Sequence, residues 1–133
     1  PVSGGLVPDR LAIDISWNRL VDPDASTGFI LDGSPRTSGQ GEALDSMLAL
    51  LQRPIDLAIY LAISAAALIE RLSHRHREDD RPAVVQHRIE IYLAQTAPLI
   101  EYYRRGDRLL AIDADRPADQ VYDAIVTGLA GRH

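Results

Sequence analysis

Residues 28–44 read GFILDGSPRTSGQGEAL, and this stretch decides the fold class. Residues 28–32 are a short apolar run that ends in an acid, which is typical of a buried strand. Residues 33–36 predict a polar turn. Apolar residues then return at helical spacing, namely Leu44, Met47, Leu48 and Leu51. A strand, a turn and a helix in this order indicate one unit of an α/β fold.

The same alternation extends to both sides of this stretch. Residues 9–20 predict a short helix with Asp9 as its cap. The Arg53-Pro54 pair ends the helix of the central stretch. Residues 55–63 predict a second buried strand, and Ser64 is expected to cap a helix that reaches about residue 73.

The second half of the chain repeats this pattern. Pro82 suits the first turn of a long helix, Pro98 should interrupt that helix, and Gly106 should end it. Residues 109–112 predict a third strand, and Pro117 opens a last helix. Strands that alternate with helices imply parallel pairing with right-handed crossovers. We therefore expect an α/β fold with three αβα layers around a parallel sheet.

Composition excludes several classes of function. The chain has 133 residues, a length typical of one domain, and its net charge is −5. It has no cysteine, which excludes disulfide scaffolds, thiolate zinc sites and cysteine nucleophiles. All 14 basic residues are arginine, so a Schiff-base lysine or a phosphate loop with its lysine is excluded within this chain.

Charge and hydropathy also bear on partners and location. A net acidic chain is a poor general binder of nucleic acid. The sequence shows no uncharged apolar stretch long enough for a membrane span, and we expect no signal peptide at its start. We expect a cytoplasmic protein with neither nucleic acid nor a membrane as its partner.

The turn after the first predicted strand is the first candidate site. Ligands of parallel sheets bind at the carboxyl ends of strands, where Asp32 stands. Its carboxylate suits a magnesium ion held through water, and Arg36 suits a phosphate. Lone acids at strand ends are common, so a polar turn with a capping residue is the alternative interpretation.

Arginines between residues 71 and 88 form the second candidate site. They are Arg71, Arg75, Arg77 and Arg88. Four guanidinium groups so close together in an acidic chain suit the binding of a polyanion. The alternative is a solvated helical face on which acidic neighbours such as Glu70 and Asp80 neutralise them. His74 and His76 are two residues apart without an evident third ligand, so we expect no metal site there.

The motifs together resemble the adenylate kinase family, in its form with a short lid. Residues 28–44 resemble its segment for the nucleoside monophosphate. Residues 71–80, RLSHRHREDD, look like its short lid, with 74–80 as a minimal lid. Residues 88–103, RIEIYLAQTAPLIEYY, resemble the helix that follows, and GLVPDR at 5–10 also matches in order. The resemblance covers nearly all of the chain, which we interpret as a single adenylate-kinase-like domain over residues 1–133.

The resemblance implies transfer of a phosphoryl group between ATP and AMP with Mg²⁺. It places the AMP phosphate on Arg36 beside Gly33, and the AMP base on Gln40. It lines the adenine pocket with the backbone of Gly5, Leu6 and Val7. It assigns ATP to Arg71 and Arg116, and the charge of the transferring phosphoryl group to Arg75, Arg77 and Arg88. Asp32 would support the magnesium site, and Asp79 would orient a lid arginine.

The resemblance begins after the opening strand and the glycine-rich phosphate loop of the family. That strand would lie between residues 28–32 and 55–63, so we expect either that these two strands close up or that a preceding segment or another chain, such as a second copy, fills this position. The alternative hypothesis is a non-catalytic relative, which binds a nucleotide or a protein and pairs with a second copy through the open edge of its sheet.

Overall fold

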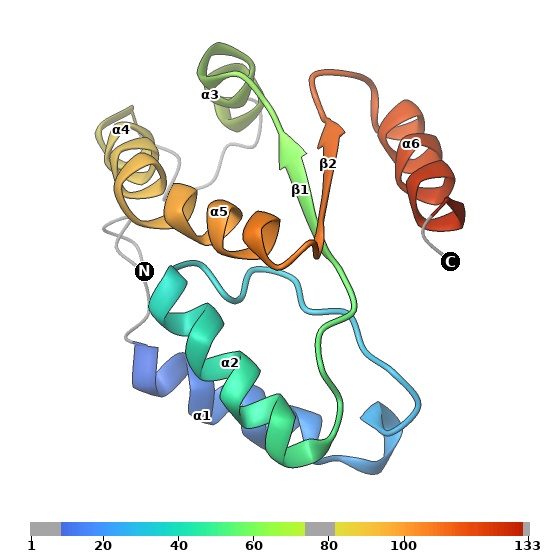
Figure 1. Cartoon of the computed structure of the whole chain (residues 1–133). Helices are drawn as coiled ribbons and strands as arrows, with labels where there is room; N and C mark the ends of the chain where they lie inside the picture. Colours follow the sequence, from blue (N-terminus) through green and yellow to red (C-terminus); the bar gives the residue numbers. More distant parts are fainter. Residues whose placement is uncertain (1–8, 74–81, 132–133) are drawn as a thin grey trace.

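The computed structural model describes residues 9–73 and 82–131 (Figure 1). Within them the elements follow in the order α1 (Asp9–Leu20), η1 (Pro23–Ala25), α2 (Ser38–Leu51), β1 (Ala58–Ala62), α3 (Ala65–Ser73), α4 (Pro82–Ile91), η3 (Tyr92–Thr96), α5 (Ala97–Arg105), β2 (Leu109–Asp113) and α6 (Ala118–Ala130). From α2 onward, helical segments and the two strands alternate as the sequence predicts. None of the described helices has both the length and the apolar character that crossing a membrane requires.

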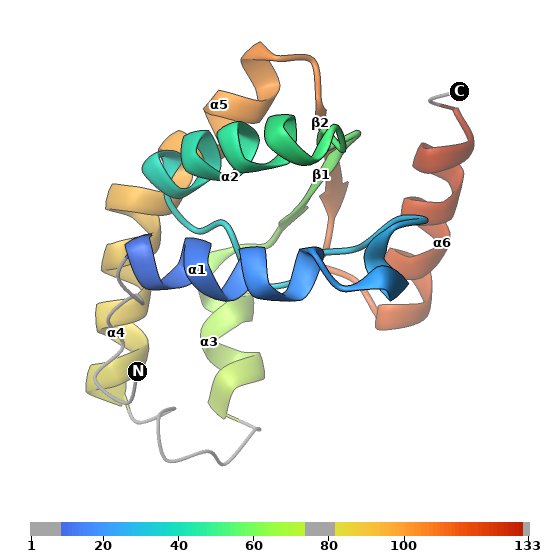
Figure 2. The ribbon, with the colours of Figure 1, turned by 90° about the horizontal axis from the view of Figure 1, so that it is seen from below.

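β1 and β2 form a parallel pair at the centre of the molecule. Their register runs from Ala58 opposite Leu109 to Ala62 opposite Asp113. α6 lies on one side of this pair, and α3, α4 and α5 lie on the other side in both views (Figures 1 and 2). The expected α/β class, with helices on both sides of a parallel sheet, is confirmed.

The prediction of a strand at residues 28–32 is wrong for the described structure. The segment carries no strand pairing, and the sheet described has two strands. Phe29 and Leu31 pack against the core, whereas the side chain of Ile30 is 95% exposed. An apolar run indicates that side chains are buried, but it does not show that the backbone pairs with another strand. Here the side chains on one side of the segment are buried against the core without such pairing.

The main core lies between α1 and α2, which run side by side (Figure 2). Its centre is formed by Leu20, Leu44 and Leu48, each at most 1% exposed, with Met47 and Ala25 beside them. α2 also packs closely on α5. A Cβ at Gly41 would lie 2.7 Å from a methyl group of Leu99, so a larger residue there would force the Leu99 side chain to shift.

Local signals set the ends of three helices. The hydroxyl of Ser64 accepts a hydrogen bond from Ala67 N at 3.2 Å, which confirms Ser64 as the cap of α3. α4 begins at Pro82, and its regular winding stops at η3, just before Pro98. α5 ends at Gly106 as predicted, but Gly106 has a φ of −82°, and the left-handed conformation belongs to Asp107. The side chain of Asp9, the expected cap of α1, lies outside the described part.

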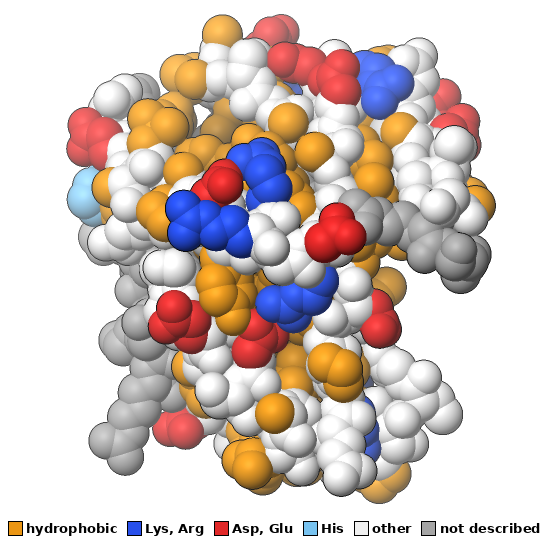
Figure 3. All heavy atoms as spheres, in the orientation of Figure 1, with side chains coloured by type: hydrophobic (Ala, Val, Ile, Leu, Met, Phe, Trp, Pro, Cys, Tyr) orange, Lys and Arg blue, Asp and Glu red, His pale blue; other side chains and the backbone are white. Residues whose placement is uncertain are grey.

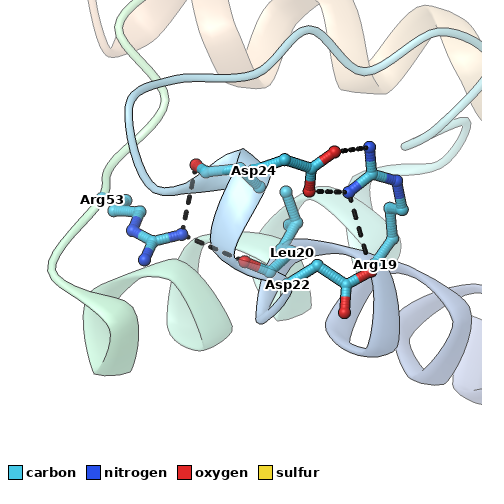
Figure 4. Close-up of polar contacts among 6 residues, drawn as sticks. Arg19, Leu20, Asp22, Asp24 and Arg53 are labelled. Carbon is cyan, nitrogen blue, oxygen red and sulfur yellow. Dashed lines mark hydrogen bonds and ion pairs between the residues drawn. The ribbon is translucent and has the colours of Figure 1, made fainter.

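Arg53 fixes the end of α1 from a distant part of the chain (Figure 4). Its Nη1 donates to the carbonyl oxygens of Leu20 and Ala25, at 3.0 and 3.3 Å. The last carbonyls of a helix lack partners within it, so this guanidinium supplies one. Nearby, Arg19 forms a two-fold hydrogen bond with Asp24 on the surface, at 2.8 and 2.9 Å.

The core predicts a sharp difference between two leucines of α2. We expect Leu48→Ala to lower the free energy of unfolding by about 2–5 kcal/mol, because it leaves a cavity at a fully buried position. Leu50→Ala, at a position that is 79% exposed, should change it by less than about 0.5 kcal/mol. Urea unfolding at pH 7 measures both values. Equal losses in the two variants would contradict this placement of the core.

Candidate functional site

The turn before α2 holds Arg36 in a defined position. Its backbone N–H donates to Oε1 of Gln40 at 2.7 Å, and its Nε donates to the carbonyl oxygen of Gly33 at 2.7 Å. Gly33 has a φ of +83°, and a Cβ there would lie 3.3 Å from Nη2 of Arg36. The backbone conformation therefore favours glycine, and a Cβ would also require the exposed end of Arg36 to move by a few tenths of an ångström.

Thr37 starts α2 directly after this arginine. Its hydroxyl accepts a hydrogen bond from Gln40 N at 3.1 Å, so it caps the helix. Gln40 is 3% exposed, and its side-chain oxygen receives the Arg36 N–H. The structure thus brings Gly33, Arg36 and Gln40 together as one unit, with Gln40 supporting the backbone of Arg36.

The side chain of Arg36 is exposed. In the described ranges, neither Nη1 nor Nη2 makes a hydrogen bond or an ion pair. The N-terminus of α2 adds the positive end of a helix dipole close by. A guanidinium with both terminal nitrogens available suits two-fold hydrogen bonding to a phosphate or a carboxylate.

A second group of site residues lies where the two strands end. Nη2 of Arg71, on α3, donates to the carbonyl oxygens of Ala114 and Arg116, at 2.8 and 2.9 Å. Nε of Arg116 donates to the carbonyl oxygen of Asp113 at 3.1 Å. The structure therefore brings Arg71 and Arg116 together, and it engages part of each guanidinium in holding the loop after β2.

The remaining predicted residues fall into two sets. Arg88 is half-buried in the last turn of α4, and Asp32 is exposed in the turn before Gly33. Gly5, Leu6, Val7, Arg75, Arg77 and Asp79 lie outside the described residues. No group of three potential metal-ligating acids or histidines occurs in the part of the chain that was described. Asp32 is a single carboxylate, which fits a magnesium ion held mainly by water and phosphate oxygens.

An ion pair that sequence reasoning missed joins α2 to the start of β2. Arg108 donates to both carboxylate oxygens of Asp45, at 3.2 and 2.9 Å, and Tyr102 donates a further hydrogen bond to Asp45. The guanidinium also lies 4.9 Å from the ring centre of Tyr103. The two charged residues are 63 positions apart, so no local pattern could reveal the contact.

The pKa values of this cluster follow from its contacts. Burial alone would raise the pKa of Asp45, but hydrogen bonds from Arg108 and Tyr102 outweigh it, and the pKa lies below its ordinary value. The hydrogen bond to Asp45 raises the pKa of Tyr102. Burial raises the pKa of Tyr103 to about 12. At neutral pH the pair is therefore charged and both phenols are neutral.

Basic and acidic side chains are interspersed on the face that Figure 3 shows. Ion pairs between described residues include Arg104 with Glu101 and Arg108 with Asp45. Most of the described arginines are engaged with acids or carbonyl oxygens. Arg36 keeps its two terminal nitrogens available and has no acidic partner among the described residues, whereas Arg105 and Arg116, which are also engaged only through Nε, each pair with an acid.

Comparison with known proteins identifies relatives over most of the chain. A family model described as "Adenylate kinase" matches residues 2–108. "Adenylate kinase 2" of a Nostoc species is 40% identical over 125 residues, which are 94% of this chain and 68% of that protein. "Adenylate kinase" of a Cyanothece species is 42% identical, with 90% of this chain and 63% of that protein covered. "Adenylate kinase" of Thermobifida fusca is 38% identical, with shares of 97% and 70%. The chain thus spans roughly two thirds of the length of these relatives.

The Asp45 cluster predicts a defined pH dependence of stability. Because the pKa of Asp45 is lower in the folded state, its contribution is complete above the unfolded pKa of about 3.9 and is lost as pH falls through the folded value. We expect Asp45→Asn to be less stable than the natural chain at pH 7, with the difference shrinking below about pH 4. Urea unfolding between pH 3 and 7 measures it.

Asp123→Asn, at an exposed position of α6, is the matched control for the Asp45 variant. The free energy of unfolding of this variant should stay close to that of the natural chain across the same pH range. A difference between Asp45→Asn and the natural chain that stays constant below pH 4 would contradict the assignment of the low pKa to Asp45.

Proposed function

Because the chain belongs to the adenylate kinase family, we propose that it binds AMP at Arg36 and takes part in the exchange of a phosphoryl group between ATP and AMP. A phosphate oxygen of AMP attacks the γ-phosphorus of ATP, the bond from that phosphorus to the β-phosphate oxygen breaks, and two ADP result. The observation that carries the proposal is the Arg36 guanidinium, which is held through Nε while Nη1 and Nη2 stay available.

The requirements of phosphoryl transfer support this assignment. The reaction depends on positioning and on neutralising negative charge that is spread over the phosphate oxygens. Every basic side chain of this sequence is a guanidinium, apart from four histidines. Arg36 has the geometry to bind the phosphate of AMP, and Gly33 and Gln40 keep it in place.

The other site residues complete the proposal as the family resemblance places them. Arg71 and Arg116 would lie near ATP, and their shared loop after β2 gives them a fixed spacing. Arg88 would meet the transferring phosphoryl group, together with Arg75 and Arg77. Gln40 would also contact the AMP base, and the backbone at residues 5–7 would line its pocket. Asp79 would orient a lid arginine.

Members of the adenylate kinase family use Mg²⁺ with the nucleotide. We propose that Asp32 holds this ion through water, because its carboxylate is exposed in the turn beside Arg36. When bound, the ion would supply positive charge to the phosphates of ATP. The residues of this chain would supply the rest of the charge as guanidinium groups.

AMP binding to the purified chain tests the role of Arg36. We expect Arg36→Ala to weaken AMP affinity by about ten-fold or more, because it removes charge-assisted hydrogen bonds to the phosphate. Isothermal titration calorimetry measures the affinity. Arg105→Ala is the control, since Arg105 is 81% exposed and makes one long ion pair at 3.9 Å. Equal affinity of the natural chain and Arg36→Ala would contradict the assignment.

A coupled assay with ATP, AMP and Mg²⁺ separates the kinase from a non-catalytic nucleotide-binding relative. Turnover that falls in Arg36→Ala supports phosphotransfer by this chain. AMP binding without turnover supports the second hypothesis, in which the chain binds the nucleotide alone.

A further inference from the structure

A short π-helix interrupts the helix that carries Arg88. In η3 the N–H of Ala97 donates to the carbonyl oxygen of Tyr92, five residues earlier. Pro98 explains the wider turn, because proline has no N–H and its ring would clash with the carbonyl four residues before it, at Ala94. Single π-turns within helices occur frequently at functional sites.

The wider turn directs two side chains to other parts of the fold. Thr96 Oγ1 donates to the carbonyl oxygen of Arg36 at 2.7 Å, across 60 positions in sequence. Threonine within a helix commonly donates to the carbonyl four residues earlier instead. At the other end of η3, the hydroxyl of Tyr92 donates to that of Tyr60 on β1 at 2.9 Å. η3 is therefore attached to both the Arg36 turn and the sheet.

The contact from Thr96 differs from the other two that hold Arg36. Gln40 and Gly33 lie within four residues of Arg36, so they fix the shape of the turn and not its place in the fold. Thr96 belongs to another element, one that follows α4 and its Arg88 directly. Its hydroxyl therefore joins the turn to the element next to Arg88.

We propose that Thr96 is a positioning residue, whose hydroxyl holds the Arg36 turn at a fixed place relative to α4 and thereby aligns Arg36 with the phosphate of a nucleoside monophosphate. The identity of this ligand rests on the proposed function. The contact itself is a property of the described structure and is tested without a ligand.

Two variants isolate the hydroxyl from the rest of the side chain. Thr96→Val keeps the shape and removes the donor, whereas Thr96→Ser keeps the donor. Thr127→Val, at an exposed position of α6, is the control for the loss of a hydroxyl elsewhere. The Arg36 carbonyl lies at the surface, where water can replace the lost donor, so we expect Thr96→Val to remain folded.

The first readout is cleavage by trypsin after Arg36, identified by mass spectrometry on the natural chain and the variants without ligand. Cleavage requires local opening of the turn. The second readout is AMP affinity by calorimetry. We expect Thr96→Val to cleave about three- to ten-fold faster at this bond and to lose a similar factor in AMP affinity, as one lost hydrogen bond implies. Thr96→Ser should stay close to the natural chain in both.

Each outcome decides a separate point. If Thr96→Val leaves cleavage after Arg36 unchanged, the positioning role is overturned. If Thr96→Val is cleaved faster but binds AMP as tightly as the natural chain, while Arg36→Ala binds it more weakly, the contact is only structural. The proposal is then also overturned. If no form binds AMP and Thr96→Val still accelerates cleavage while Thr96→Ser does not, the proposed function fails and the hold on the Arg36 turn is supported.

Discussion

The parallel pairing of β1 with β2 is the constraint on which the rest of the structure depends. Five residue pairs, from Ala58–Leu109 to Ala62–Asp113, join segments about fifty positions apart. The pairing closes α3, α4, η3 and α5 into one crossover on one side of the sheet (Figure 1). It also brings the carboxyl ends of both strands to one edge, where Ser64 N donates to Asp115. Arg71 and Arg116 meet at this edge because the strands are parallel.

The arginines of the chain have two kinds of role, one structural and one proposed for ligand binding. Arg53 holds the end of α1, Arg71 holds the loop after β2, and Arg108 joins α2 to the start of β2. Each of these guanidiniums donates to carbonyl or carboxylate oxygens of a distant part of the chain. Arg36 is held by the same kind of contact at Nε, but its terminal nitrogens face outward. Guanidinium groups thus both stabilise the fold and, at Arg36, provide an exposed positive charge.

The sequence predicts those features that depend on local chemistry. Ser64 caps α3, Pro82 begins α4, and the helix winding changes just before Pro98, as their side chains require. The stretch from Gly33 to Gln40 forms the predicted turn and helix start. The strand at residues 28–32 was wrong because an apolar run shows which side chains are buried and not which backbone finds a partner.

Contacts between positions far apart in the sequence could not be predicted from local sequence patterns. The pairs Asp45–Arg108 and Arg36–Thr96 join residues about sixty positions apart: the first links α2 to the residue before β2, and the second links the turn before α2 to η3. The roles of Asp32, Arg36, Gln40, Arg71, Arg88 and Arg116 in binding stay predictions, as do those of the site residues outside the described ranges. The positions of the described arginines leave one question open: which guanidiniums bind a ligand and which only stabilise the fold.

One measurement distinguishes the arginines that bind a ligand from those that only stabilise the fold. Arginine Nε–Hε resonances of the chain, followed by NMR during titration with AMP, report each guanidinium separately. The account predicts a saturable shift at Arg36, while the structural arginines Arg53 and Arg108 keep their positions in the spectrum. A shift at Arg53 or Arg108 with none at Arg36 would contradict it.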